Sequence, residues 1–229
     1  MGDIGIEWVK DYSARRGEWG SLSNTQTNAE GFYNTLNATQ QFANGNNAAQ
    51  DQHFEQANKG APKAGSATIV VETVDMVYFA GHGTSLGFEF GVFSDDARAK
   101  PAEIRWGAGR LKWVVLNACN VLLDKPGFHA IDRWGQTFVG LRYILGFGSS
   151  ANDEPIRGQK FAEYLNMGDT IGDAWRKAVE ETEPPATIWA YLRADGNGVT
   201  TDQDTWLAHA SASSKPNPPA MLHYLQGVV

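Results

Sequence analysis

The chain has little of what several classes of protein require. It carries one cysteine, Cys119, so no internal disulfide can form and the sequence gives no sign of an oxidising compartment. No apolar run reaches the roughly 18 residues that a membrane-spanning helix needs, and no signal peptide is visible. We therefore expect no membrane partner, and a protein that is either cytoplasmic or secreted with its signal missing from this sequence.

Basic residues are scarce as well. Lysine and arginine number 19 against 26 aspartate and glutamate residues, which gives a net charge of −7 and a pI near 5.2. Nucleic-acid partners normally require a basic face, so we expect none. The five histidines include no closely spaced ligand pair, and no Walker loop or His-Glu-x-x-His motif is present. Neither a metal nor a cofactor is therefore expected.

Apolar runs alternate with helical stripes along most of the chain. Because 42% of its 229 residues are hydrophobic, the chain can bury a substantial core. The patterns predict strands at residues 4–12, 74–80, 112–119, 143–148 and 187–192, and helices at 28–36, 131–141, 155–166 and 170–181. This alternation implies an α/β fold with a mainly parallel central sheet. No repeat or linker is visible, so we expect one domain over residues 1–229, with 196–229 as a C-terminal extension.

Other segments have weaker patterns. Residues 49–58 favour a helix, 67–72 and 88–93 favour extended structure, and 221–229 favour a last strand or an edge segment. Thr170 precedes Asp173 by three residues at the start of a helical stripe, which resembles a capping box.

Two of the predicted strands end in residues with catalytic chemistry. Residues 74–80 lead into His82 and Gly83, and residues 112–118 lead into Cys119. Because sites form at the carboxyl ends of parallel strands, we expect the imidazole and the thiol to lie side by side. The imidazole can take the thiol proton, and the N–H groups of Gly83 and Cys119 can form an oxyanion hole. A free cysteine is more often a small core residue, but its placement beside Gly-His-Gly favours catalysis.

The order strand–His82-Gly83, then strand–Ala118-Cys119, resembles the signature of the caspase-like cysteine peptidases. That clan includes caspases, metacaspases, gingipains, clostripain, legumain, separase and the bacterial CHAT domains. Residues 143–183 are similar to the part of CHAT and gingipain-type domains that follows the cysteine strand, and residues 77–88 are similar to an uncharacterised bacterial family of the clan. The resemblance covers roughly residues 70–195. It implies a caspase-like three-layer sandwich, a protein or peptide substrate, and hydrolysis of peptide bonds by a His82–Cys119 dyad.

The resemblance also indicates where specificity is set. In this clan the pocket for the residue before the cut is lined from the ends of the first strand, the cysteine strand and the strand that follows. Here those ends carry Asp11, Asn120, Asp153 and Glu154. Carboxylates at Asp153 and Glu154 can bind an arginine or lysine side chain by charge-assisted hydrogen bonds. Cleavage after a basic residue is therefore expected.

Alternatives to this interpretation stay open. Asp153 and Glu154 immediately precede a predicted helix, where acidic residues commonly cap the backbone. Arg15 and Arg16 follow the first strand, where they would either bind an acidic substrate side chain or lie solvated in a loop. The residues after Cys119 are Asn-Val-Leu-Leu, without the Ser or Gly that several caspase-like peptidases carry. The second functional hypothesis is therefore a catalytically inactive caspase-like module for interaction or self-association.

Overall fold

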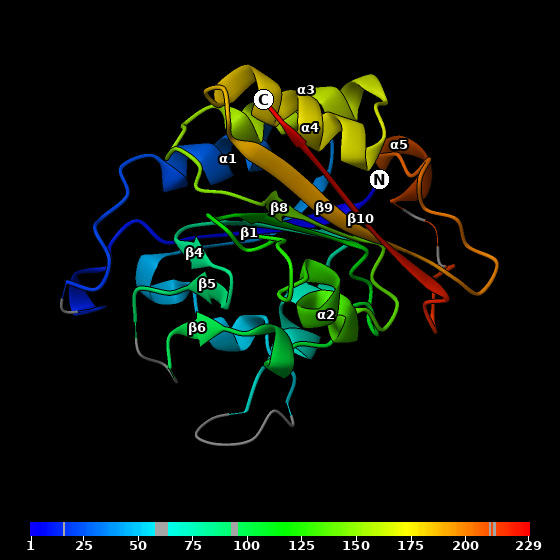
Figure 1. Ribbon diagram of the computed structural model, residues 1–229, viewed down its shortest axis with the longest axis horizontal. Helices are drawn as coiled ribbons and strands as arrows, with labels where there is room; N and C mark the ends of the chain where they lie inside the picture. Colours follow the sequence, from blue (N-terminus) through cyan, green and yellow to red (C-terminus); the bar gives the residue numbers. More distant parts are fainter. Residues whose placement is uncertain (16, 58–63, 93–95, 211, 213) are drawn as a thin grey trace.

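The protein has a mixed α/β fold. The structure is a computed structural model that describes residues 1–15, 17–57, 64–92, 96–210, 212 and 214–229. The central strands are β1 (Asp3–Trp8), β2 (Thr39–Gly45), β3 (Met76–Ala80), β7 (Trp113–Asn117), β8 (Tyr143–Phe147), β9 (Ile188–Asp195) and β10 (Met221–Val228). Within the described residues they form a seven-stranded sheet in the order β10-β9-β8-β7-β3-β1-β2 (Figure 1).

Most neighbours in this sheet are parallel. β2, β1, β3, β7 and β8 run in one direction, whereas β9 is antiparallel to β8 and β10 is antiparallel to β9. β3 and β7 are buried along their whole length, as expected for central parallel strands rich in branched and aromatic residues. The predicted mainly parallel central sheet is confirmed.

Layers cover both faces of the sheet (Figure 1). Helices α1 (Thr25–Thr35), α3 (Arg157–Met167), α4 (Ile171–Thr182) and the short α5 (Trp206–His209) lie on one side. On the other side lie α2 (Ala130–Trp134) and a small antiparallel sheet made of β4 (Gly83–Thr84), β5 (Gly87–Glu89) and β6 (Arg98–Ala99). This small sheet continues directly from the segment that carries His82.

Strand alternation divides the core into two clusters. On β3, Tyr78 faces the helices and stacks on Phe32 of α1, with ring centroids 4.8 Å apart. Its neighbour Phe79 faces the small sheet and contacts Phe88 of β5 at 4.8 Å. Because successive side chains point to opposite faces, one strand anchors both layers. The position of His82 just beyond β3 is therefore fixed from both sides.

Some predicted elements differ in the structure. The helix expected at 49–58 is replaced by short 3-10 turns at Asn46–Ala48 and Asp51–His53, and residue 58 lies outside the described residues. The extended structure expected at 67–72 is a pair of 3-10 turns, Ala67–Ile69 and Val71–Thr73. The helix expected at 131–141 ends as α2 at Trp134 and continues as a 3-10 turn, Gly135–Thr137.

The two edges of the central sheet are formed by segments with weak sequence signals. β2 is polar and largely exposed, and it pairs in parallel with β1. The chain beyond residue 196 returns to the sheet as β10, which pairs with β9 over its whole length. Among the helices that the structure describes, none is long and apolar enough to cross a membrane.

Candidate functional site

The predicted histidine and cysteine lie at the same edge of the sheet. β3 and β7 are parallel neighbours with Ala80 opposite Asn117, so both strands end together. Beyond these ends, His82 and Cys119 line one cavity of about 90 Å³. The other residues that line it are Leu22, Thr25, Gly81, Asn117, Ala118, Phe147, Ala151, Asn152, Asp153 and Arg157. The topology thus brings the two candidate catalytic residues into one cavity, as sites at the carboxyl ends of parallel strands require.

The His82 ring is held on several sides. Its Nε2 lies 2.8 Å from the carbonyl oxygen of Gly20, and its ring centroid lies 4.7 Å from that of Trp19 and also from that of Tyr12. A carbonyl can only accept, so Nε2 carries the hydrogen of the neutral imidazole. The lone pair is consequently on Nδ1, the nitrogen that can act as a base.

Cys119 is half-buried and lies at the cavity, outside the apolar core clusters. Its Sγ lies 3.3 Å from the amide nitrogen and 3.4 Å from the carbonyl oxygen of Ala151, in the loop after β8. These two contacts hold the sulfur against the backbone of the loop after β8. Among the described residues, nothing accepts a hydrogen bond from the Cys119 amide, so this N–H is available to a ligand.

Gly83 lies where β4 crosses the turn that carries the cysteine. A Cβ added to it would come within 2.8 Å of Ala118 Cβ and 2.9 Å of the Cys119 carbonyl oxygen. The absence of a side chain therefore permits the close approach of the two segments. The oxyanion hole built from the Gly83 and Cys119 N–H groups stays a prediction.

Of the two acidic residues after β8, only Asp153 lines the cavity. Its Oδ2 accepts hydrogen bonds from the Asn24 amide at 2.8 Å and the Ser23 hydroxyl at 3.4 Å. Glu154 is tied to α1 through its backbone carbonyl, which accepts from the Asn28 side chain. Neither carboxylate caps α3, because its N-cap is Ile156 and no side chain makes a capping bond there.

Two further predicted substrate-binding residues do not line the cavity. Asp11 is exposed, and a hydrogen bond from the Ser13 amide at 2.8 Å lowers its pKa. Asn120 adopts a left-handed conformation with φ of 59° in the turn after Cys119, and its amide donates to the Ser149 carbonyl at 2.9 Å. Both residues shape the local backbone near the site.

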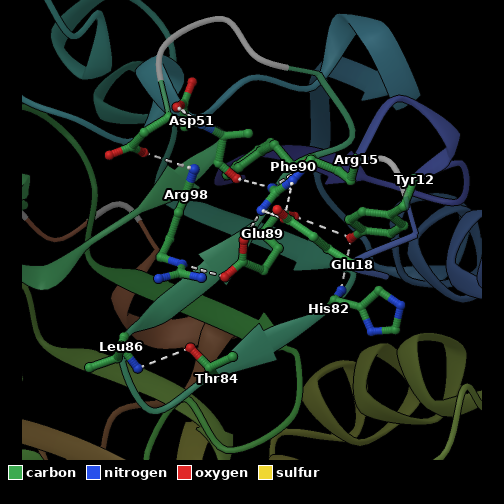
Figure 2. A network of polar contacts seen from close by, with 12 residues as sticks. Tyr12, Arg15, Glu18, Asp51, His82, Thr84, Leu86, Glu89, Phe90 and Arg98 are labelled. Atoms are coloured by element: carbon green, nitrogen blue, oxygen red, sulfur yellow. Dashed lines mark hydrogen bonds and ion pairs between the residues drawn. The ribbon is translucent and has the colours of Figure 1, made fainter. Parts of the chain in front are cut away.

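Arg15 is buried and holds neighbouring segments of the fold together. Its guanidinium donates to the carbonyls of Phe90 and Ala97 at 3.0 and 2.9 Å and to Glu89 at 3.1 Å (Figure 2). The expectation that it binds an acidic substrate or lies solvated is therefore wrong. Its neighbour Arg16 lies outside the described residues.

Sequence reasoning missed Arg157 and the 19–20 segment. Arg157 is 1% exposed, lines the cavity, donates to Asn117 Oδ1 at 2.7 Å and pairs with Glu183. Burial lowers the pKa of its guanidinium. No local signal could identify it, because its ion-pair partner lies at the end of another helix. Trp19 and Gly20 lie in a polar stretch that predicted only a loop.

No group of three or more His, Cys, Asp or Glu side chains suited to hold a metal ion occurs in the part of the chain that the structure describes. Asp195, at the start of an Asp-Gly-Asn-Gly stretch, accepts from the Thr201 amide at 2.8 Å and pairs with Arg193 and His223. Gly196 and Val199 bridge across that stretch, which is a turn.

The fold and site define a mixed α/β protein with a histidine and a cysteine at the carboxyl edge of a mostly parallel sheet. A family model described as a domain of unknown function, DUF6345, matches residues 6–227, and the chain belongs to that family. An uncharacterized protein of Archaeoglobus fulgidus is 27% identical over 144 residues, which cover 58% of this chain and 51% of the relative. The chain thus spans about half the length of this curated relative.

Proposed function

We propose that this protein is a cysteine endopeptidase of the caspase-like type, with His82 and Cys119 as its catalytic dyad. One observation carries the proposal: both residues follow adjacent parallel strands and line the same cavity. The hydrogen bond from His82 Nε2 to the Gly20 carbonyl supports it further, because it leaves the lone pair of Nδ1 for proton transfer.

The proposed reaction proceeds through an acyl-enzyme. His82 accepts the thiol proton, and the Cys119 sulfur attacks the scissile carbonyl carbon. The N–H groups of Cys119 and Gly83 hold the resulting oxyanion. The C–N bond then breaks, and His82 returns the proton to the departing amine. Water, deprotonated by His82, attacks the thioester; the acid product leaves and the thiol is restored.

Asp153 supports a preference for a basic residue before the cut. It is the acidic side chain that lines the cavity, and its Oδ2 is oriented by Asn24 and Ser23. Carboxylates bind arginine and lysine by charge-assisted hydrogen bonds. We expect Asp153→Asn to lower kcat/KM for basic substrates by about 10- to 100-fold, on the scale of one charged hydrogen bond. Kinetics with matched basic and neutral fluorogenic peptides measure this change; an equal loss for both peptides contradicts the assignment.

The dyad itself is tested by alkylation and by peptide cleavage. Cys119 is the only thiol, so iodoacetamide reports on it alone. At neutral pH we expect faster labelling than for a thiol in an unfolded peptide, slower labelling in His82→Ala, and unchanged labelling in the control His129→Ala, whose ring is exposed beside Asp124. Cys119→Ala should cleave no member of a peptide panel that varies the residue before the cut. Equal cleavage by wild type and Cys119→Ala would end the enzyme proposal.

The second candidate is the inactive interaction or self-association module. The small cavity, about 90 Å³, and the contacts of Cys119 Sγ with both polar atoms of Ala151 favour it. Light scattering coupled to size exclusion, together with the labelling rates, separates the two. Stable self-association with a Cys119 rate equal to that of the peptide thiol supports the module.

A further inference from the structure

The His82 ring packs against two aromatic rings contributed by the segment after β1. Trp19 stacks on it with an interplanar angle of 27°, and Tyr12 packs on it at 56°. The first is close to a parallel stack and the second is tilted, at equal centroid distances of 4.7 Å. An imidazole in contact with two rings has little freedom to turn about its Cβ–Cγ bond, because rotation would drive its edge into a neighbouring ring.

Tyr12 has structural contacts of its own. It is fully buried, its hydroxyl accepts from the His82 amide at 2.9 Å, and the same hydroxyl donates to the Glu89 carbonyl at 3.2 Å (Figure 2). Burial raises the pKa of this hydroxyl, so Tyr12 stays neutral. Replacing it would disturb the backbone of His82 as well as its ring, and it is therefore a poor probe of ring orientation.

Trp19 is a better probe of the orientation of the His82 ring. It is half-buried, and its neighbour Gly20 supplies the carbonyl that accepts from His82 Nε2. Backbone hydrogen bonds hold the chain on both sides: Glu18 donates to Arg15 at 3.1 Å, and Leu22 donates to Lys10 at 2.9 Å. These bonds do not involve the indole, so a substitution at Trp19 removes its stack on His82 and its packing on the neighbouring apolar core, and leaves the backbone contacts in place.

We propose that Trp19 is a positioning residue that keeps the His82 ring in the orientation in which Nε2 donates to Gly20 and Nδ1 serves as the base. The indole face has a second effect, because it attracts a cation and so stabilises the imidazolium that forms when His82 takes the thiol proton. The inference rests on the proposed function for its catalytic consequence. Its structural content, a single ring orientation and tautomer maintained by Trp19, stands separately.

The catalytic consequence is measured with Trp19→Leu and the conservative Trp19→Phe. An aromatic–cation contact of this kind corresponds to about two- to thirtyfold in rate, so we expect that loss in kcat for Trp19→Leu with KM changed by less than about twofold. Trp19→Phe should restore most of the rate because it returns a ring face. Tyr164→Leu, an aromatic-to-leucine change at a half-buried residue of α3 that does not line the cavity, is the matched control and should leave kcat unchanged. A loss confined to KM, or no rescue by phenylalanine, overturns the proposal.

The ring orientation is measured without any substrate. Nitrogen NMR of isotope-labelled protein should give His82 as a single tautomer with its hydrogen on Nε2 in wild type and Trp19→Phe, and as a mixture in Trp19→Leu. Thermal unfolding midpoints verify that each variant is folded. Identical His82 signals in wild type and Trp19→Leu overturn the proposal. If His82→Ala labels Cys119 as fast as wild type and no peptide is cleaved, the proposed function fails, while the tautomer result still decides the role of Trp19.

Discussion

Gly83 stands where the segment after His82 passes over the cysteine turn. A methyl group there would lie 2.8 Å from Ala118 Cβ and Val121 Cγ1, closer than carbon atoms approach without a backbone shift. Overpacking of this kind costs about 1–3 kcal/mol. We expect Gly83→Ala to lower the free energy of unfolding by that amount in urea denaturation and to slow the alkylation of Cys119. Gly20→Ala, where an added Cβ meets nothing within 4 Å, is the stability control. Equal stabilities of the two variants would contradict this explanation.

Another pair of side chains gives the stability a pH dependence. Glu7 is fully buried on β1, and its Oε1 lies 2.6 Å from His53 Nδ1. Burial lowers the pKa of His53, but the hydrogen bond and charge of Glu7 outweigh it, and the net shift is upward. The pKa of Glu7 is also raised, in this case by burial itself, because burial disfavours the charged carboxylate. Both groups therefore bind protons more tightly in the folded state than in the unfolded chain.

The sign of the effect follows from this linkage. Stability from a raised pKa is complete below the unfolded value, about 4.3 for Glu and about 6.5 for His, and is lost as pH rises through the folded value. We expect the free energy of unfolding of wild type to fall between pH 5 and 8 relative to Glu7→Gln. This substitution removes the Glu7 carboxyl and, with it, the main cause of the raised His53 pKa. Urea denaturation across that range measures the difference. Parallel pH profiles of the two proteins would refute it.

Single residues also divide into those that sequence can and cannot identify. His82 and Cys119 are recognisable because each directly follows an apolar run, a local signal of a strand end. Trp19, Gly20 and Arg157 have no such signal, since their roles come from contacts with residues far along the chain. Sequence spacing therefore predicts the proposed reacting groups better than the groups that hold them.

At the scale of elements, the start of α4 illustrates a local rule that holds. Thr170 Oγ1 accepts from the Asp173 amide at 3.2 Å, as the capping pattern predicts. We expect Thr170→Ala to reduce the free energy of unfolding by about 1 kcal/mol, because one amide of the first turn loses its acceptor. Thr200→Ala, an exposed threonine outside the helices, is the matched control and should be neutral. Denaturant midpoints of the two variants give the comparison, and equal midpoints would exclude a capping role.

Elements without a hydrophobic period were predicted less well. β2 has mostly polar, exposed residues. It forms a strand because it pairs with β1, and no local sequence pattern predicts that pairing. Residues 67–72 are rich in β-formers, yet they turn, and the Glu72 side chain in them accepts from the Gly107 and Gly109 amides at 2.6 Å each. Tertiary hydrogen bonds override propensity in both segments.

At the scale of the whole molecule, the helical layer is linked to the cavity by a buried ion pair. Arg157 at the start of α3 pairs with Glu183, which follows the end of α4. Glu183 also accepts from the Asn152 amide at 3.0 Å. Asn152 adjoins Ala151, whose backbone contacts Cys119 Sγ. The carboxylate thus ties the packing of two helices to the loop that surrounds the thiol.

Removing one member of this pair leaves the other charge buried, which costs about 3–5 kcal/mol, whereas apolar side chains at both positions avoid that penalty. We therefore expect large losses in the free energy of unfolding for Glu183→Gln and for Arg157→Met, and a double variant, Arg157→Met with Glu183→Leu, that is less destabilised than the sum. Urea denaturation in a double-mutant cycle measures the coupling, and additive losses would contradict it. Cys119 alkylation should change in Glu183→Gln even where the protein is fully folded, because the Asn152 amide loses its charged acceptor beside the thiol loop.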